Sequence, residues 1–248
     1  MNHGCCHLSL VPVRERASDQ SEMVTQVVFG DVFEILDTKP KWVKIKNAFD
    51  GYEGWIDDKQ YISISVAHFK KQKEQLLKCS TDLVEYVQDN NGHLMPIVIG
   101  SSVDGMKNLG FELDLNKSQG KVRKQDIVDT ALLFLNSPYL WGGKSPFGLD
   151  CSGFTQMVYK ICGIKLYRDS SQQAQQGHSL SFIEEAQPGE LAFFDNEEGR
   201  IIHVGILMQN NYIIHAHGKV RIDRLDHSGI FNAETKNYSH QLRVIKQI

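Results

Sequence analysis

The sequence has no long hydrophobic run, no excess of one charge and no regular cysteine spacing. None of its apolar stretches approaches the roughly 20 residues that a membrane-spanning helix needs. A formal net charge of −3 over 248 residues indicates no partner among nucleic acids or anionic membranes. The N-terminus lacks the basic and apolar regions of a secretory signal, so we expect a cytoplasmic protein. The five cysteines include no CxxC pair, which argues against a disulfide framework.

What the sequence does have is a turn-rich stretch, residues 137–163, that leads one cysteine into a helix. Apolar residues recur after Asp150 at three- and four-residue spacing, with Asp150 as the predicted N-cap and Gly163 as the predicted stop. Cys151 would then occupy the first turn. Unpaired backbone N–H groups and the helix dipole favour a thiolate there, so we expect a lowered thiol pKa and a nucleophile.

The first part of the chain is predicted to be a small barrel. Short runs rich in β-branched and aromatic residues are separated by turn signals; they cover residues 23–29, 32–36, 41–46 and 52–56. Residues 1–64 are therefore the first predicted domain. Residues 65–116 give weaker strand signals and are predicted to be a second small β-rich module of SH3-like type.

Residues 117–248 are predicted to form the last domain. A helix at residues 125–136, with an apolar stripe of Ile127, Val128, Ala131, Leu132 and Leu135, precedes the Cys151 helix. Strands follow after Pro188-Gly189. Helices first and antiparallel strands afterwards predict an α+β fold.

Two histidines accompany the strands. His203 begins one strand and His215 ends the next, with a tight turn between them. In an antiparallel pair both would lie near the same end of the hairpin. One could then act as base toward a thiol while the other orients it.

Four sequence blocks, in this order, resemble the NlpC/P60 family of papain-like cysteine peptidases: Tyr139-Leu-Trp-Gly-Gly143 with Asp150-Cys-Ser-Gly-Phe154, Pro188-Gly-Glu-Leu191, His203-Val-Gly-Ile206 and Ile214-His-Ala216. The resemblance implies a papain-like fold and no cofactor. It implies Cys151 as nucleophile, His203 as base and His215 as the orienting residue. It also implies that the Tyr139 hydroxyl helps to stabilise the oxyanion, beside the Cys151 backbone N–H.

The N-terminal part resembles bacterial SH3 (SH3b) domains through Gln26–Asp31, Trp42–Ile45 and Gly54-Trp55-Ile56. SH3b and NlpC/P60 domains together resemble the γ-D-glutamyl-L-diamino acid endopeptidases, which act on peptidoglycan stem peptides with a free N-terminal L-alanine. The resemblance implies hydrolysis of the γ-D-glutamyl–diamino acid bond in murein peptide recycling. The expected substrate-binding residues are Asp150, Ser152, Ser170, Glu22 and Tyr52, with Asp150 both capping the helix and binding the substrate's amino group.

Two alternatives stay open from the sequence. The chain could be a cell-wall-binding SH3b protein whose hydrolase domain is degenerate or differently specific. Alternatively, Cys151 with Asp150 and the two histidines could hold a zinc ion, although a thiol at a helix start favours catalysis. The preferred diamino acid and the oligomeric state do not follow from the residues.

Overall fold

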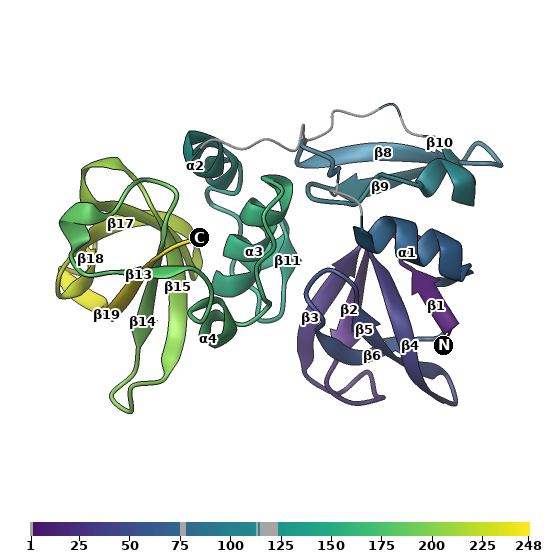
Figure 1. Ribbon diagram of the computed structural model, residues 1–248, viewed down its shortest axis with the longest axis horizontal. Helices are drawn as coiled ribbons and strands as arrows, with labels where there is room; N and C mark the ends of the chain where they lie inside the picture. Colours follow the sequence, from purple (N-terminus) through teal and green to yellow (C-terminus); the bar gives the residue numbers. More distant parts are fainter. Residues whose placement is uncertain (1, 75–77, 113, 115–123) are drawn as a thin grey trace.

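The computed structural model describes residues 2–74, 78–112, 114 and 124–248. It places a seven-stranded N-terminal sheet, a small three-stranded sheet and a larger C-terminal part next to one another (Figure 1). None of the described helices is long and apolar enough to cross a membrane.

The N-terminal sheet is an SH3-like barrel with strand order β3-β2-β6-β5-β4-β1-β7. Its strands are β1 (Asn2–Cys5), β2 (Leu10–Arg14), β3 (Met23–Val28), β4 (Val32–Lys39), β5 (Trp42–Asn47), β6 (Glu53–Asp57) and β7 (Ile62–Ile64). Four of these lie within a few residues of the predicted strands. Alternating apolar residues such as Val11, Val13 and Ile45 point inward and form the barrel's core.

The middle segment packs on this barrel through helix α1 (Val66–Glu74). Strands β8 (Val84–Asp89), β9 (Leu94–Val98) and β10 (Phe111–Glu112) form a sheet in the order β10-β8-β9, and a short 3₁₀ helix η1 (Met106–Leu109) precedes β10. The described residues thus form a β-rich module, but with fewer strands than the SH3-like barrel that the sequence suggested for this segment.

The C-terminal part begins with helices and ends in strands. Its elements are α2 (Lys124–Leu133), β11 (Lys144–Ser145), β12 (Gly148–Leu149), α3 (Cys151–Ile161), α4 (Ser170–Gln173), β13 (His178–Leu180), η2 (Ile183–Glu185), β14 (Leu191–Asp195), β15 (Ile201–Leu207), η3 (Gln209–Asn211), β16 (Tyr212–His217), β17 (Lys219–Asp226), β18 (Gly229–Asn232) and β19 (Asn237–Gln247). The pairings named for the large sheet, which runs from β13 to β19, are all antiparallel.

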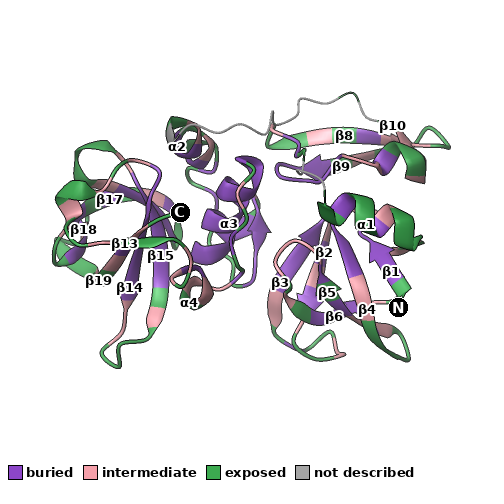
Figure 2. Ribbon diagram, in the orientation of Figure 1, coloured by how far each residue is buried: buried purple, intermediate pink, exposed green. Residues whose placement is uncertain are grey.

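This large sheet closes on itself because β19 pairs with both β14 and β18. Alternation along β14 separates two cores: Leu191 and Phe193 pack toward the helices, whereas Ala192 and Phe194 belong to the opposite core. Helix α3 is buried along its whole length (Figure 2). The helix that starts at Cys151 is therefore held between the sheet and the N-terminal barrel.

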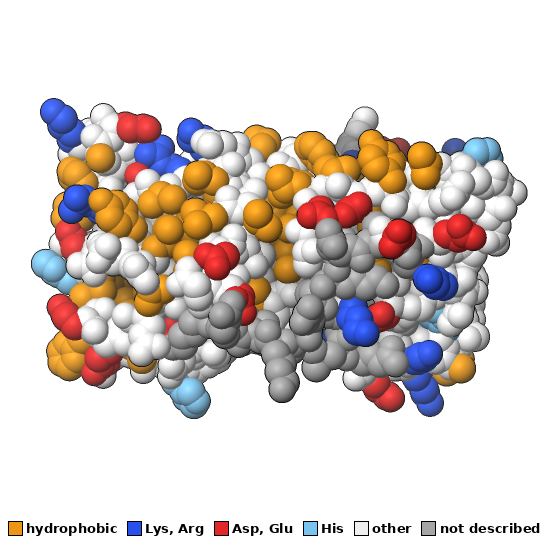
Figure 3. Space-filling model, turned by 90° about the horizontal axis from the view of Figure 1, so that it is seen from above, with side chains coloured by type: hydrophobic (Ala, Val, Ile, Leu, Met, Phe, Trp, Pro, Cys, Tyr) orange, Lys and Arg blue, Asp and Glu red, His pale blue; other side chains and the backbone are white. Residues whose placement is uncertain are grey.

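The apolar stripe predicted for the helix at residues 125–136 is only partly right. Ile127, Val128 and Ala131 are buried, but Leu132 and Leu135 are exposed. The helix ends at Leu133, so the chain leaves the helical path and Phe134 enters the core in place of the following leucine. Figure 3 shows hydrophobic side chains gathered in several places on the face seen from above.

The barrel and the C-terminal part are joined through a fully buried ion pair. Lys160 Nζ of α3 lies 2.7 Å from Asp31 Oδ1 of the barrel. Ser102 of the middle segment donates to the same Asp31 oxygen at 3.2 Å. A single carboxylate thus contacts all three parts of the chain, and breaking such a pair would leave a charge buried and uncompensated.

Candidate active site

Cys151 stands at the first position of helix α3, as the sequence predicts. Asp150 is the N-cap, and its side chain accepts a hydrogen bond from the Gly153 backbone N–H at 2.6 Å. At the other end, Gly163 follows the C-cap residue with a positive φ of 78°. The cap and the stop are both confirmed.

The structure raises the pKa of the Cys151 thiol, whereas the sequence predicts a lowered pKa. Burial raises the pKa of Cys151 to about 12, and Asp150 acts in the same direction. Backbone N–H groups of Val204 and Ser152 act in the opposite direction. The prediction of a lowered pKa is wrong here because the thiol is only 7% exposed, so desolvation outweighs the helix terminus. The protonated thiol needs a base, and its contact with Val204 places it against the strand that carries His203.

The two histidines meet across strands β15 and β16. His215 pairs with Gly205, which puts its ring on the same sheet face as that of His203. The Nε2 atom of His203 lies 2.8 Å from Nδ1 of His215, and both rings are buried. Burial lowers the pKa of both imidazoles, so both are neutral at neutral pH.

Sequence reasoning missed the next group in this series, Asp223 on β17. Its Oδ2 atom lies 3.0 Å from Nε2 of His215. Arg221 donates to both oxygens of the same carboxylate, at 2.6 and 3.0 Å. His215 and the arginine hold the pKa of Asp223 below its usual range, although burial acts against them. The sequence signal was the Arg-Ile-Asp alternation on the strand after His215.

His240 is a second omission. Its ring stacks on that of His203, with centroids 4.0 Å apart and planes 20° apart. It comes from β19, far along the chain, and it is half-buried. Burial lowers the pKa of His240 to about 4. The base candidate is thus covered by a neutral aromatic ring.

A cavity of about 500 Å³ opens beside Cys151. Its lining comes from both the barrel and the C-terminal part: Glu22, Val24, Tyr52, Trp141, Asp150, Cys151, Ser152, Arg168, Asp169, Ser170, Ser171, Ile201 and Ile202. The structure therefore brings Cys151 together with all five of the predicted substrate-binding residues. Tyr139 lies close enough to the thiol that Cys151 and Asp150 add to the burial that raises the pKa of its phenol to about 12.

Asp150, however, has little capacity left for a substrate. Its two oxygens receive hydrogen bonds from the backbone N–H groups of Gly142 and Gly153, the Ser152 hydroxyl and two guanidinium nitrogens of Arg168. A carboxylate offers about four lone-pair sites, and these five donors occupy them. The expected contact between Asp150 and a substrate ammonium is contradicted by this arrangement.

Asp169, the N-cap of α4, is a carboxylate that the sequence analysis did not assign to the site. It lines the cavity and accepts a hydrogen bond from the Tyr52 hydroxyl of the barrel. Burial raises the pKa of Asp169, and burial together with Asp169 raises that of Tyr52 to about 12. Glu22, exposed on the same side, accepts a hydrogen bond from Trp141 Nε1 at 2.5 Å. Two carboxylates, one from the barrel and one from the C-terminal part, therefore line the cavity.

A metal site is not favoured by the same geometry. Within the part of the chain that the structure describes, no three His, Cys, Asp or Glu side chains are grouped so as to hold an ion. Asp150 is occupied by Arg168, and His203 and His215 bond to each other.

Comparison with known proteins decides the family. Residues 136–238 match the NlpC/P60 family, and residues 13–60 match the bacterial dipeptidyl-peptidase Sh3 domain. The chain carries an NlpC/P60 peptidase domain joined to a bacterial SH3 domain. The NlpC/P60 match contains Cys151, His203, His215 and Asp223, and the Sh3 match contains Glu22 and Tyr52. The cavity therefore lies between the NlpC/P60 domain and the SH3 domain.

Relatives of this peptidase include two named gamma-D-glutamyl-L-lysine dipeptidyl-peptidase. The protein of Bacillus cereus is 27% identical over 230 residues, which cover 80% of this chain and 68% of the relative. The protein of Bacillus subtilis is 28% identical over 216 residues, which cover 77% of this chain and 71% of the relative. A crystal structure of an NlpC/P60 family protein from Bacillus cereus shares the fold, with a TM-score of 0.77 over 99% of both chains at 21% identity.

Proposed function

We propose that this NlpC/P60 peptidase hydrolyses the bond between γ-D-glutamate and the diamino acid in peptidoglycan stem peptides with a free N-terminal L-alanine, releasing L-Ala-D-Glu. The observation that carries the proposal is a cavity whose lining includes Cys151 and two carboxylates, Glu22 from the barrel and Asp169 from the C-terminal part. An ammonium in a partly buried site needs such charged acceptors. The names of the two relatives support the same substrate class.

In the proposed reaction, Cys151 is the nucleophile and His203 the general base. The thiol proton passes to His203 as sulfur attacks the γ-carbonyl carbon, and His203 then gives that proton to the departing amine of the diamino acid. Water, deprotonated by the same imidazole, hydrolyses the thioester. Because burial raises the pKa of Cys151 to about 12 and lowers that of His203, the resting pair is neutral and proton transfer accompanies attack.

The developing oxyanion has two proposed donors. The Cys151 backbone N–H lies in the first turn of α3, where no intrahelical acceptor is available to it. The Tyr139 hydroxyl is the second donor. The raised pKa of this phenol keeps it protonated, as a donor must be.

The free amino group of the substrate is proposed to sit between Glu22, Asp169 and the Tyr52 hydroxyl. The Trp141 indole holds Glu22 through one oxygen and leaves the other for the ligand. Ser152 and Ser170, also in the cavity lining, are proposed to bind the dipeptide backbone. The Asp150 contact is left out because Arg168 and the backbone occupy that carboxylate.

A stem peptide has a free amino terminus only after its link to the glycan has been cut. The proposed substrate is therefore a breakdown product of the cell wall, and the reaction fits the recycling of murein peptides. Binding of intact wall is not required by this proposal.

The test is a comparison of L-Ala-γ-D-Glu-L-Lys with its N-acetylated form. We expect kcat/KM to be about 100-fold higher for the free amine, since the acetylated peptide leaves the two cavity carboxylates without their charged partner. Glu22→Gln should reduce this preference about tenfold, whereas Glu53→Gln, an exposed ion-pair residue on β6, should leave it unchanged. Equal cleavage of both peptides by the wild type would overturn the proposed specificity.

A further inference from the structure

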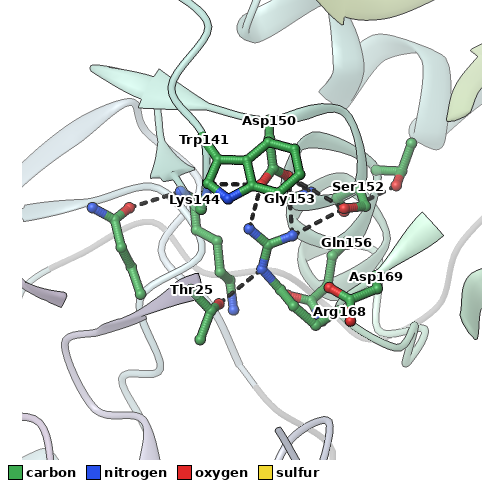
Figure 4. A network of polar contacts seen from close by, with 12 residues as sticks. Thr25, Trp141, Lys144, Asp150, Ser152, Gly153, Gln156, Arg168 and Asp169 are labelled. Carbon is green, nitrogen blue, oxygen red and sulfur yellow. Dashed lines mark hydrogen bonds and ion pairs between the residues drawn. The ribbon is translucent and has the colours of Figure 1, made fainter. Parts of the chain in front are cut away.

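Arg168 is buried between the two domains and bonds to both. Its side chain is 1% exposed. Nη1 and Nη2 donate to the two oxygens of Asp150 at 3.0 and 2.6 Å, and Nη1 also donates to Ser152 Oγ at 2.9 Å. On the opposite side, Nε donates to Thr25 Oγ1 of the SH3 domain at 2.8 Å (Figure 4).

The carboxylate that Arg168 holds also fixes the start of the helix that carries the thiol. Asp150 caps α3 through Gly153 N–H and ties down the preceding loop through Gly142 N–H at 2.8 Å. Gly142 has a φ of 76°, and a Cβ added there would lie 2.2 Å from the Met23 carbonyl oxygen of strand β3. The loop thus rests directly on the strand that supplies Thr25.

We infer that Arg168 is a positioning residue that transmits the docking of the SH3 domain, through Thr25, to Asp150 and the start of the Cys151 helix. The planar guanidinium is held by three residues, Asp150, Ser152 and Thr25, so displacement of the barrel would remove the Thr25 hydrogen bond, one of the contacts that fix its plane. The SH3 domain then does more than border the cavity: it completes the support of the nucleophile. The inference rests on the proposed role of Cys151.

Thr25→Val is the variant that isolates this connection. It removes the hydroxyl and keeps the shape, and Thr25 is not among the cavity-lining residues. The adjacent Gln26 provides a matched control. Its Oε1 atom accepts a hydrogen bond from the Lys144 backbone N–H at 2.7 Å, so Gln26→Met removes a buried bond between the same two domains without touching Arg168 or Asp150.

The readouts are kcat and KM for the tripeptide, and the rate at which iodoacetamide alkylates Cys151, followed on the Cys151 peptide by mass spectrometry across pH. Thr25→Val should lower kcat about tenfold with KM within twofold of wild type, and should change the pH profile of Cys151 alkylation. Arg168→Lys, which cannot bridge the same acceptors, should lower kcat about 100-fold. Thr25→Ser, which restores the hydroxyl, should recover at least half of the wild-type kcat.

Gln26→Met should leave kcat and alkylation within twofold of wild type. Equal losses of kcat in Thr25→Val and Gln26→Met would overturn the inference, since docking in general would then matter and not the contact with Arg168. Unchanged kcat and alkylation in Thr25→Val would overturn it as well. If the wild type cleaves no tripeptide, the proposed function fails, yet the alkylation profiles still decide whether Arg168 positions Cys151.

Discussion

His203 Nε2 and His215 Nδ1 are joined by a hydrogen bond of 2.8 Å. This bond fixes which nitrogen of His203 can act as a base. The Asp223 carboxylate can only accept, so His215 Nε2 carries a proton and its Nδ1 accepts. His203 Nε2 must then be the donor in the bond between the rings. The lone pair of His203 is thereby left on Nδ1, a tautomer assigned from the hydrogen-bond network.

Asp223→Asn should reverse this order of donors and acceptors. An asparagine amide can donate to His215 Nε2, which would move the proton of His203 onto Nδ1 and block the base. We expect kcat to fall at least about 100-fold with little change in KM, because a proton on Nδ1 of His203 leaves the base without its lone pair. Steady-state kinetics on the tripeptide measures this.

Asp226→Asn is the matched control for that variant. Asp226 lies on the same strand, β17, but bonds to Tyr238 and not to the histidines. Its kcat should stay within twofold of wild type. If both variants lost the same activity, Asp223 would act through the stability of β17 and not through His215.

The pH dependence follows from the burial of His203. Burial, followed by the nearby histidines, lowers the pKa of His203 well below 6.5. The base is active when neutral, so activity appears as the pH rises through this lowered value. The acid limb of kcat/KM should therefore lie below pH 6.5 and reach its plateau before neutrality. An acid limb at or above pH 6.5 would contradict this environment for His203.

The stacked ring of His240 should matter through its shape and not through its charge. Because burial lowers the pKa of His240 to about 4, the ring is neutral at neutral pH. His240→Phe keeps an aromatic cover over His203 and should retain kcat within about threefold, while His240→Ala should lose about tenfold. Comparison of kcat for the two variants is the measurement. Equal losses would show that the imidazole itself is required.

The buried Lys144 is expected to lower the free energy of unfolding. It is fully buried, and Nζ has no hydrogen-bond partner among the described residues. Burial lowers the pKa of Lys144 from 10.5 to about 8, which corresponds to a penalty of about 3 kcal/mol while the unfolded lysine is charged.

Lys144→Met should therefore raise the free energy of unfolding at pH 7 by up to about 3 kcal/mol. The unfolded chain binds more protons than the folded one between pH 8 and 10.5, so the wild type gains stability as the pH rises through this window. The stability gain of Lys144→Met over the wild type should therefore shrink as the pH rises. Urea unfolding at pH 7 and pH 10 measures the difference, and a gain that does not change with pH would contradict the assigned cause.

The sequence predicted the parts of this site that depend on local patterns. The cap at Asp150, the helix behind Cys151 and the hairpin joining His203 and His215 all follow from spacing and turn chemistry within short segments. The structure places these groups together, while their catalytic roles stay predictions.

The site residues that the sequence did not predict are brought to the site by the pairing of strands. Asp223 meets His215 only through the register of β16 with β17, and His240 arrives from a strand that closes the sheet. The misassigned contact of Asp150 depended on Arg168, whose side chain fills the place expected for a ligand. The thiol pKa was misjudged because burial, which no local pattern shows, outweighs the helix terminus.

The most direct test is the identity of the products released from L-Ala-γ-D-Glu-L-Lys and from its meso-diaminopimelate analogue, determined by mass spectrometry for the wild type and for Cys151→Ala. The wild type should release L-Ala-D-Glu and the free diamino acid from at least one of the two peptides, and Cys151→Ala should release neither product. Release of free alanine, or undiminished turnover by Cys151→Ala, would contradict the proposed reaction.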